Sequence, residues 1–317
     1  MPLRRCAVAI AIAALAVPAT AAAAPAAKPL KLRLATSTKT VTIPATNAIG
    51  GVFADSQRVV AACKQTERSV APGLVAAPRP LAGQSFGFAT VSAFATGQPG
   101  RVRFGLQALC ASGGSATSVT TKRVEGRHVP GTDASIGGLT TGRTTATARC
   151  GAGRVAIGAP LSQEFAPGLG RFVSRPLSAA VWQVQAFRVP DTLAANRTVP
   201  AYADVACVAA RHVKLYQVVS ATTADLHMAT SATLTVQCPG ARRPLGWGVD
   251  LRPYALQLGT QDGRWLLPTV SRAQLTAKAV AFALTLPEGA TPAAEHGLAM
   301  GDVTQTVYVV CGALTGK

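Results

Sequence analysis

Three stretches decide how this chain is organised: CKQTERSVAPGL at residues 63–74, CGAGRVAIGAPL at 150–161 and CPGARRPLGWGV at 238–249. They align from their cysteines without a gap. The seventh residue after each cysteine is aliphatic, the eighth is Ala or Gly, and the eleventh is again aliphatic. Basic residues stand four or five positions after each cysteine. The spacing of 87 and 88 residues between these cysteines predicts an internal threefold repeat.

Two further shared segments follow each stretch. A strand-like segment ends in Ala-Phe at Phe94, Phe187 and Phe282, and an alternating segment then ends in a second cysteine. Runs of β-branched residues with period two, broken by Gly and Pro, are typical of strands. We therefore expect an all-β fold of three repeats with four to five strands each. The repeats would run over residues 30–113, 114–210 and 211–317, and are called the first, second and third units below. They would close into one pseudo-threefold β-prism or follow one another as three small β-sandwiches.

The chain has seven cysteines, of which Cys6 lies in the N-terminal segment discussed next. The other six would allow 15 pairings, and an even number is typical of disulfides in an exported protein. If each unit carries its own bridge, the pairs are Cys63–Cys110, Cys150–Cys207 and Cys238–Cys311.

The N-terminal segment has the features of a secretory signal peptide. Arg4 and Arg5 precede an apolar run over residues 6–17, and small residues follow. The apolar run is too short to cross about 30 Å of hydrocarbon. We expect a signal peptide over residues 1–24, with cleavage after Ala23 or Ala27, and a mature chain without a transmembrane segment. The mature protein would be extracellular or held in the cell envelope.

The pattern of cysteine, small residues and Gly, a central aromatic strand, and a strand ending in Cys-Ala or Cys-Gly resembles a repeat of uncharacterised exported proteins of actinobacteria. The resemblance covers nearly all of residues 50–317. More distantly, three cysteine-containing β repeats are similar to the β-prism of the vitelline membrane outer layer protein. The resemblance implies an exported all-β protein and brings no established activity with it.

Composition excludes several classes of protein. The chain is 49% hydrophobic and only 14% charged, which excludes wholesale disorder. Frequent Pro and Gly after position 43 exclude a helical bundle. The formal net charge of +18, or +16 without Arg4 and Arg5, favours polyanionic partners such as acidic polysaccharide, wall polymers, anionic lipid or nucleic acid. The alternative is that the Arg content only reflects a GC-rich genome.

Few residues suggest catalysis. The chain contains 13 carboxylates and four His, and it lacks G-x-S-x-G, C-x-x-C and zinc-like spacings. We expect no enzyme activity, no cofactor and no metal. The polar and aromatic groups of the third unit, in its long segments 249–275 and 286–304, form the candidate ligand-binding set. These residues are Tyr254, Asp262, Arg264, Glu288, Glu295, His296 and Asp302.

This candidate set has several interpretations. Its carboxylates suit a cation-binding loop, but they equally suit a solvated polar loop, and a hydrolase using Glu295 and His296 is a third possibility. Trp182, Trp247 and Trp265 are expected to pack in the core. The function we expect is that of an exported, non-catalytic protein that binds acidic polysaccharide or a cell-wall polymer, without specific nucleic-acid recognition. The alternative is a purely structural extracellular protein.

Overall fold

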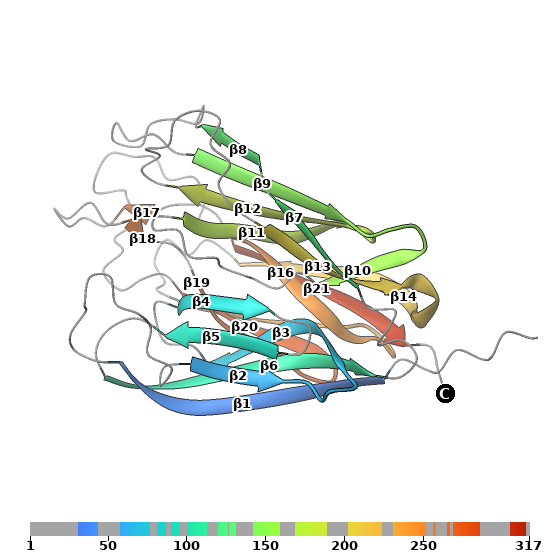
Figure 1. Cartoon of the computed structure of the whole chain (residues 1–317), viewed down its shortest axis with the longest axis horizontal. Coiled ribbons are helices and arrows are strands. Elements are labelled where there is room, and N and C mark those ends of the chain that lie inside the picture. The colour runs from blue at the N-terminus through green and yellow to red at the C-terminus, as the bar shows by residue number, and fades with distance from the viewer. Residues whose placement is uncertain are drawn as a thin grey trace, which may run out of the picture.

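The computed structural model describes the following ranges of the chain: residues 31–43, 58–76, 81–86, 90–95, 100–112, 120–125, 127–130, 142–158, 169–188, 202–223, 231–251, 256–257, 265–266, 269–285 and 305–314. Nearly all of these residues lie in β-strands, which confirms the predicted all-β class (Figure 1). The signal segment and the seven candidate ligand-binding residues lie outside the described ranges.

The units contain six, seven and eight described strands, more than the four to five expected. The first unit has β1 (Lys31–Ile43), β2 (Arg58–Ala62), β3 (Arg68–Ala76), β4 (Leu81–Phe86), β5 (Thr90–Ala95) and β6 (Gly100–Ser112). The second has β7 (Thr120–Glu125), β8 (Arg127–Pro130), β9 (Gly142–Arg149), β10 (Arg154–Gly158), β11 (Leu169–Ser178), β12 (Val181–Arg188) and β13 (Tyr202–Ala209). The third has β14 (Val213–Thr222), β15 (Ser231–Gln237), β16 (Arg243–Leu251), β17 (Leu256–Gln257), β18 (Trp265–Leu266), β19 (Thr269–Leu275), β20 (Ala279–Thr285) and β21 (Gln305–Leu314).

The expected number was too low because several strands lack a clear alternation of apolar and polar residues. In β11, for example, Arg175 and Pro176 interrupt the pattern, although the strand pairs with both β12 and β16. A short 3-10 turn, η3 (Ala210–His212), joins β13 to β14.

The same antiparallel pairing order occurs in three successive parts of the chain. In the first unit the last strand lies between the first and third (β1-β6-β3), and the fifth lies between the second and fourth (β2-β5-β4). The second unit repeats this order as β7-β13-β10 and β9-β12-β11, and the third repeats it as β14-β21-β16 and β15-β20-β19. Each unit thus contributes two groups of three strands.

Strand pairs also cross the predicted unit boundaries. Leu74 of β3 pairs with Ala273 of β19, which joins strands of the first and third units in one six-stranded sheet. Val173 of β11 pairs with Asp250 of β16, which joins the second and third units in one seven-stranded sheet. The two largest sheets are therefore shared between units.

Each unit has its own disulfide, with the pairing predicted from the sequence. Cys63–Cys110, Cys150–Cys207 and Cys238–Cys311 have Cα–Cα distances of 5.5, 5.7 and 5.6 Å. The first cysteine of each pair directly follows a strand of one three-stranded group, and the second lies within the central strand of the other group. Each bridge therefore connects the two strand groups of one unit.

The three units meet at the eighth residue after each first cysteine. These residues are Ala71, Gly158 and Gly246. A Cβ atom built on Gly158 would lie 3.4 Å from the Gly246 Cα and 3.6 Å from the Ala71 Cβ. All three aligned stretches have a small residue at this position for a packing reason, because three backbones approach one another here.

One hydrophobic core draws residues from all three units. Trp247 lies edge-on to Phe282, with ring centroids 5.8 Å apart, and its Nε1 donates a 2.7 Å hydrogen bond to the Pro72 carbonyl. Trp182 is also buried, as predicted, and its Nε1 donates to the Ser174 hydroxyl at 3.0 Å. The indoles thereby bury large apolar surfaces with their polar atoms satisfied.

Candidate functional site: the basic cysteine end

The predicted third-unit site lies outside the described residues, so its geometry stays a prediction. The predicted segment 249–275 contains two acidic residues, Asp250 and Asp262, of which the structure describes Asp250. Asp250 is buried and accepts a 2.7 Å hydrogen bond from Nη1 of Arg175, which makes it part of the junction between β11 and β16. Trp265 begins the short strand β18, which pairs with β17.

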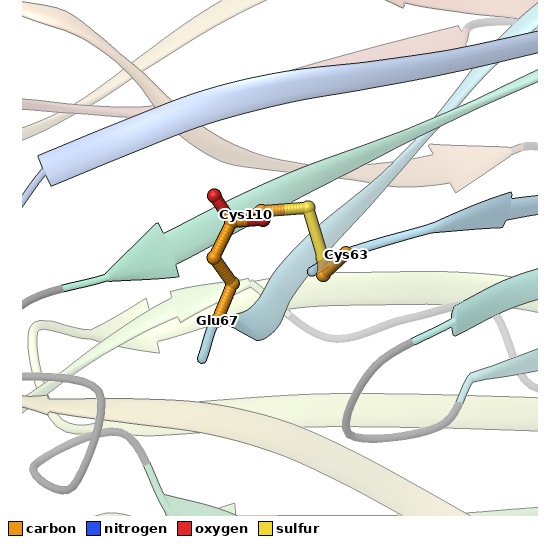
Figure 2. A group of neighbouring side chains, drawn as sticks. All are labelled: Cys63, Glu67 and Cys110. Atoms are coloured by element: carbon orange, nitrogen blue, oxygen red, sulfur yellow. A yellow bond between two sulfur atoms is a disulfide. The ribbon is translucent and has the colours of Figure 1, made fainter. Parts of the chain in front are cut away.

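A different group of residues surrounds the first disulfide (Figure 2). The sulfur atoms of Cys63 and Cys110 and a carboxylate oxygen of Glu67 lie within 4.8 Å of one another. Metal binding by cysteine requires thiolates, and both sulfurs are joined in the disulfide. Glu67 is instead held by Arg33, whose Nε and Nη2 donate hydrogen bonds of 3.0 and 2.6 Å to its two carboxylate oxygens.

This ion pair determines the charge state of Glu67. The hydrogen bonds from Arg33 lower the pKa of Glu67 to about 2 against the opposing effect of burial, and the backbone N–H of Lys64 lowers it further. That N–H donates to Oε2 at 2.8 Å. The buried carboxylate is thus ionised at neutral pH and its charge is offset by Arg33. Sequence reasoning missed Glu67, because only the neighbouring Arg68 was aligned with the basic residues of the other units.

Glu67 occupies the fourth position after the first cysteine, and this position has the same structural task in all three units. In the second unit Arg154 takes the position, and its Nη1 donates to the Thr120 hydroxyl at 3.0 Å. In the third unit Arg242 donates from Nε to the Leu215 carbonyl at 2.8 Å. In every case the side chain reaches the first strand of its unit, at the residue opposite the second cysteine in the first two units and two residues before that position in the third. The contact locks the turn after the first cysteine onto that strand.

The turns and strand ends beside the six cysteines lie at one end of the molecule, on the right in Figure 1, where β6, β9 and β21 finish. We call this the cysteine end. Its described residues include eleven Lys and Arg residues and one acid, Glu67. The basic residues are Lys31, Arg33, Lys64, Arg68, Arg149, Arg154, Arg211, Lys214, Arg242, Arg243 and Lys278.

Several basic side chains of the cysteine end face solvent. Lys64 in the first unit, Arg149 in the second and Lys214 in the third are all exposed. His212 adds no charge to them at neutral pH, because burial and the neighbouring Arg211 lower the pKa of its imidazole. The end thus presents cations from each unit, with its single described carboxylate already neutralised.

The predicted third-unit site differs in charge from the cysteine end. The cysteine end has eleven described Lys and Arg residues and one acid, whereas four of the seven residues of the predicted site are acidic. These acidic residues are Asp262, Glu288, Glu295 and Asp302, and four carboxylates would repel a polyanion.

No protein-family model matches this chain, and no curated protein matches it. The family resemblance drawn from the sequence therefore stays a prediction. Within the described ranges, no helix has the length and apolar character needed to cross a bilayer.

Proposed function

We propose that this is an exported, non-catalytic protein that binds acidic polysaccharide or an acidic wall polymer through its cysteine end. The observation that carries the proposal is the charge of the cysteine end, whose described residues include eleven Lys and Arg residues and one acid, Glu67, which is paired with Arg33. Clustered exposed cations raise the local concentration of a polyanion and accelerate its association. Three disulfides support an oxidising, extracellular location.

We further propose that the units form one closed body related by a pseudo-threefold axis, the β-prism alternative of the two weighed above. The pairings β3–β19 and β11–β16, and the approach of Ala71, Gly158 and Gly246, support this arrangement. In such a body the three turns that follow the first cysteines surround the axis. A single polymer chain could then contact cations of more than one unit.

Retention on immobilised polygalacturonate, eluted with a salt gradient, tests the binding function. We expect the mature protein to be retained at low salt and released well before 1 M salt, where the Debye length is only about 3 Å. A protein that flows through the column at low salt would contradict the proposal and favour a purely structural role.

A matched pair of triple variants tests the location. Lys64→Gln, Arg149→Gln and Lys214→Gln together remove three exposed charges from the cysteine end. The control replaces Lys39, Arg101 and Arg103 by Gln; these three residues are also exposed. Arg101 lies opposite Thr42, and Thr42 is about 35 Å along β1 from Lys31 at 3.3 Å per residue. We expect the first variant to elute at clearly lower salt than the control, whereas equal shifts would mean that only net charge matters.

Shortening the segment 286–304 provides a separate test of the predicted third-unit site. Because this segment contributes Glu288, Glu295 and Asp302 and no Lys or Arg, its removal should leave retention on the polyanion unchanged or slightly stronger. If the shortened variant folds but is no longer retained, the polyanion binds to the predicted third-unit site and not to the cysteine end.

A further inference from the structure

Two exposed leucines interrupt the otherwise basic cysteine end. Leu215 is 58% exposed and Leu177 is 49% exposed, the highest values among the large hydrophobic residues that the structure describes. Leucines elsewhere in the described strands, such as Leu106 and Leu284, are at most 1% exposed. Burying such a side chain is favourable, so leaving two in water forgoes that stabilisation in the isolated protein.

Hydrogen bonds connect the two segments that carry the leucines, and these connected segments form one corner of the cysteine end. Leu177 precedes the turn between β11 and β12, and Leu215 lies near the start of β14. The Ala179 carbonyl of that turn accepts a 2.7 Å hydrogen bond from the Ala156 N–H. The Ala156 carbonyl in turn accepts a 2.8 Å bond from the hydroxyl of Tyr216. Ala156 therefore lies between the segments that carry the leucines.

The backbone of Leu215 is strained as well as exposed. Its φ is 55°, and among the described residues it is the single non-glycine residue with positive φ. The register of β14 against β21 shifts between Lys214 and Gln217, and Arg242 holds the Leu215 carbonyl with a 2.8 Å bond. A bulky residue in this region is uncommon and costs energy. The strained Leu215 backbone brings its side chain no packing in the free protein, which indicates that the side chain packs against a partner.

The residues around this corner decide which partner fits. Lys214 is exposed directly before Leu215, and Arg149 is exposed opposite Val181, just beyond the turn that follows Leu177. Glu67, the described acid of the cysteine end, is already paired with Arg33. A second copy of the chain would present the same cations and be repelled. A polysaccharide needs hydrogen-bonding or aromatic groups, which leucine does not offer. Apolar side chains surrounded by Lys and Arg suit the boundary between headgroups and acyl chains in an anionic bilayer.

We infer that the corner formed by Leu177 and Leu215 docks the protein onto an anionic lipid surface, with the leucines entering the acyl boundary and the cations contacting phosphate headgroups. The inference rests on the same basic end as the proposed function, to which it adds an apolar requirement. Acidic polysaccharide binding needs only the charges, so the two can fail separately.

Sedimentation with vesicles tests the inference, using vesicles of pure phosphatidylcholine and vesicles of equal parts phosphatidylcholine and phosphatidylglycerol. The mature protein should bind the anionic vesicles and not the neutral ones. The variant combines Leu177→Ser with Leu215→Asn, because Asn tolerates positive φ and relieves strain at that position. We expect its partition onto anionic vesicles to fall about tenfold or more, while its retention on polygalacturonate is unchanged.

The control variant combines Val60→Ser with Val218→Ser, two residues that are each 36% exposed. Val218 lies on β14 three residues beyond Leu215, about 10 Å further from the cysteine end. The control should bind anionic vesicles like the parent protein, and an equal loss would overturn the assignment to this corner. Wild-type binding by the leucine variant would also overturn the inference, as would binding of the parent to polygalacturonate but not to vesicles. A parent that binds neither probe would contradict the proposed function itself.

Discussion

At the scale of single residues, the contact between the units depends on the absence of a side chain at Gly246. A Cβ atom there would overlap the Ile157 carbonyl oxygen and lie 2.9 Å from the Gly158 Cα. Both neighbours are backbone atoms of another unit, so they cannot move aside like a flexible side chain. We expect Gly246→Ala to lower the free energy of unfolding by at least about 2 kcal/mol, measured by urea denaturation, in the upper range for overpacking a core.

Gly158→Ala is the matched control for this prediction. Its Cβ would make ordinary contacts of 3.4 and 3.6 Å with Gly246 and Ala71. The free energy of unfolding should therefore change by less than about 1 kcal/mol, and a lower entropy of the unfolded chain would even favour stability. If the two substitutions cost the same, the close approach of the three backbones does not exist in solution.

The Glu67–Arg33 pair makes stability depend on pH. The pKa of Glu67 is about 2 in the folded protein, below the value of about 4.3 in an unfolded chain. The pair therefore stabilises the fold fully above about pH 5, and its contribution disappears as the pH falls toward 2. Glu67→Gln should cost about 1–2 kcal/mol at pH 7, at the lower end because the Arg33 side chain is 40% exposed. A difference between the two proteins that stays constant from pH 7 to the acid limit, measured by urea denaturation, would contradict this assignment.

At the scale of the elements, buried polar contacts hold strands of different units together. Gln107 of β6 passes over Gly73 of β3, and its Oε1 accepts a 2.9 Å hydrogen bond from the Leu275 N–H of β19. The ion pair of Arg175 and Asp250 connects β11 to β16 in a comparable way. Both contacts coincide with the places where the two largest sheets cross the predicted unit boundaries.

Asp250→Ala should destabilise the protein strongly. The Asp250 side chain is only 4% exposed, so its removal leaves the half-buried Arg175 guanidinium without this carboxylate. We expect a loss of about 3–5 kcal/mol in urea denaturation, the usual cost of breaking a buried pair. Combining Arg175→Met with Asp250→Leu should recover most of the lost free energy of unfolding, because neither charged group of the pair then remains. Failure of the double variant to recover would mean that the backbone junction itself needs these polar groups.

At the scale of the whole molecule, the shared sheets predict that the chain unfolds as one unit. Replacing Cys150 and Cys207 by Ala removes a bridge that spans 57 residues, for which loop entropy sets an upper guide of about 4 kcal/mol. Because β11 of the second unit pairs with β16 of the third, the loss should shift a single transition. Circular dichroism and tryptophan fluorescence should then give coincident curves. Two separate transitions would favour three independent sandwiches.

The all-β class and the three disulfide pairs could be predicted without the structure. Both depend on information that is local or periodic: alternation along a strand, and cysteines at equal positions in three similar stretches. The small residues Ala71, Gly158 and Gly246 were also visible as a shared position, although nothing in the sequence showed that they meet. The prediction that Trp182 and Trp247 pack in the core is confirmed; it rested on the position of Trp182 before the Ala-Phe segment and of Trp247 within the third aligned stretch.

The sharing of sheets between units and the set of residues at the cysteine end could not be predicted, because both depend on how the chain folds in space. The pairing of β3 with β19 joins residues about two hundred positions apart, and no local pattern encodes such a register. Glu67 was overlooked because its partner Arg33 is 34 residues away and reaches it only when β1 lies beside β6. Leu215 resembles any strand residue in the sequence, and its exposure follows from a register shift against β21. Periodicity describes what a strand buries, whereas the folded arrangement decides which residues remain at the surface.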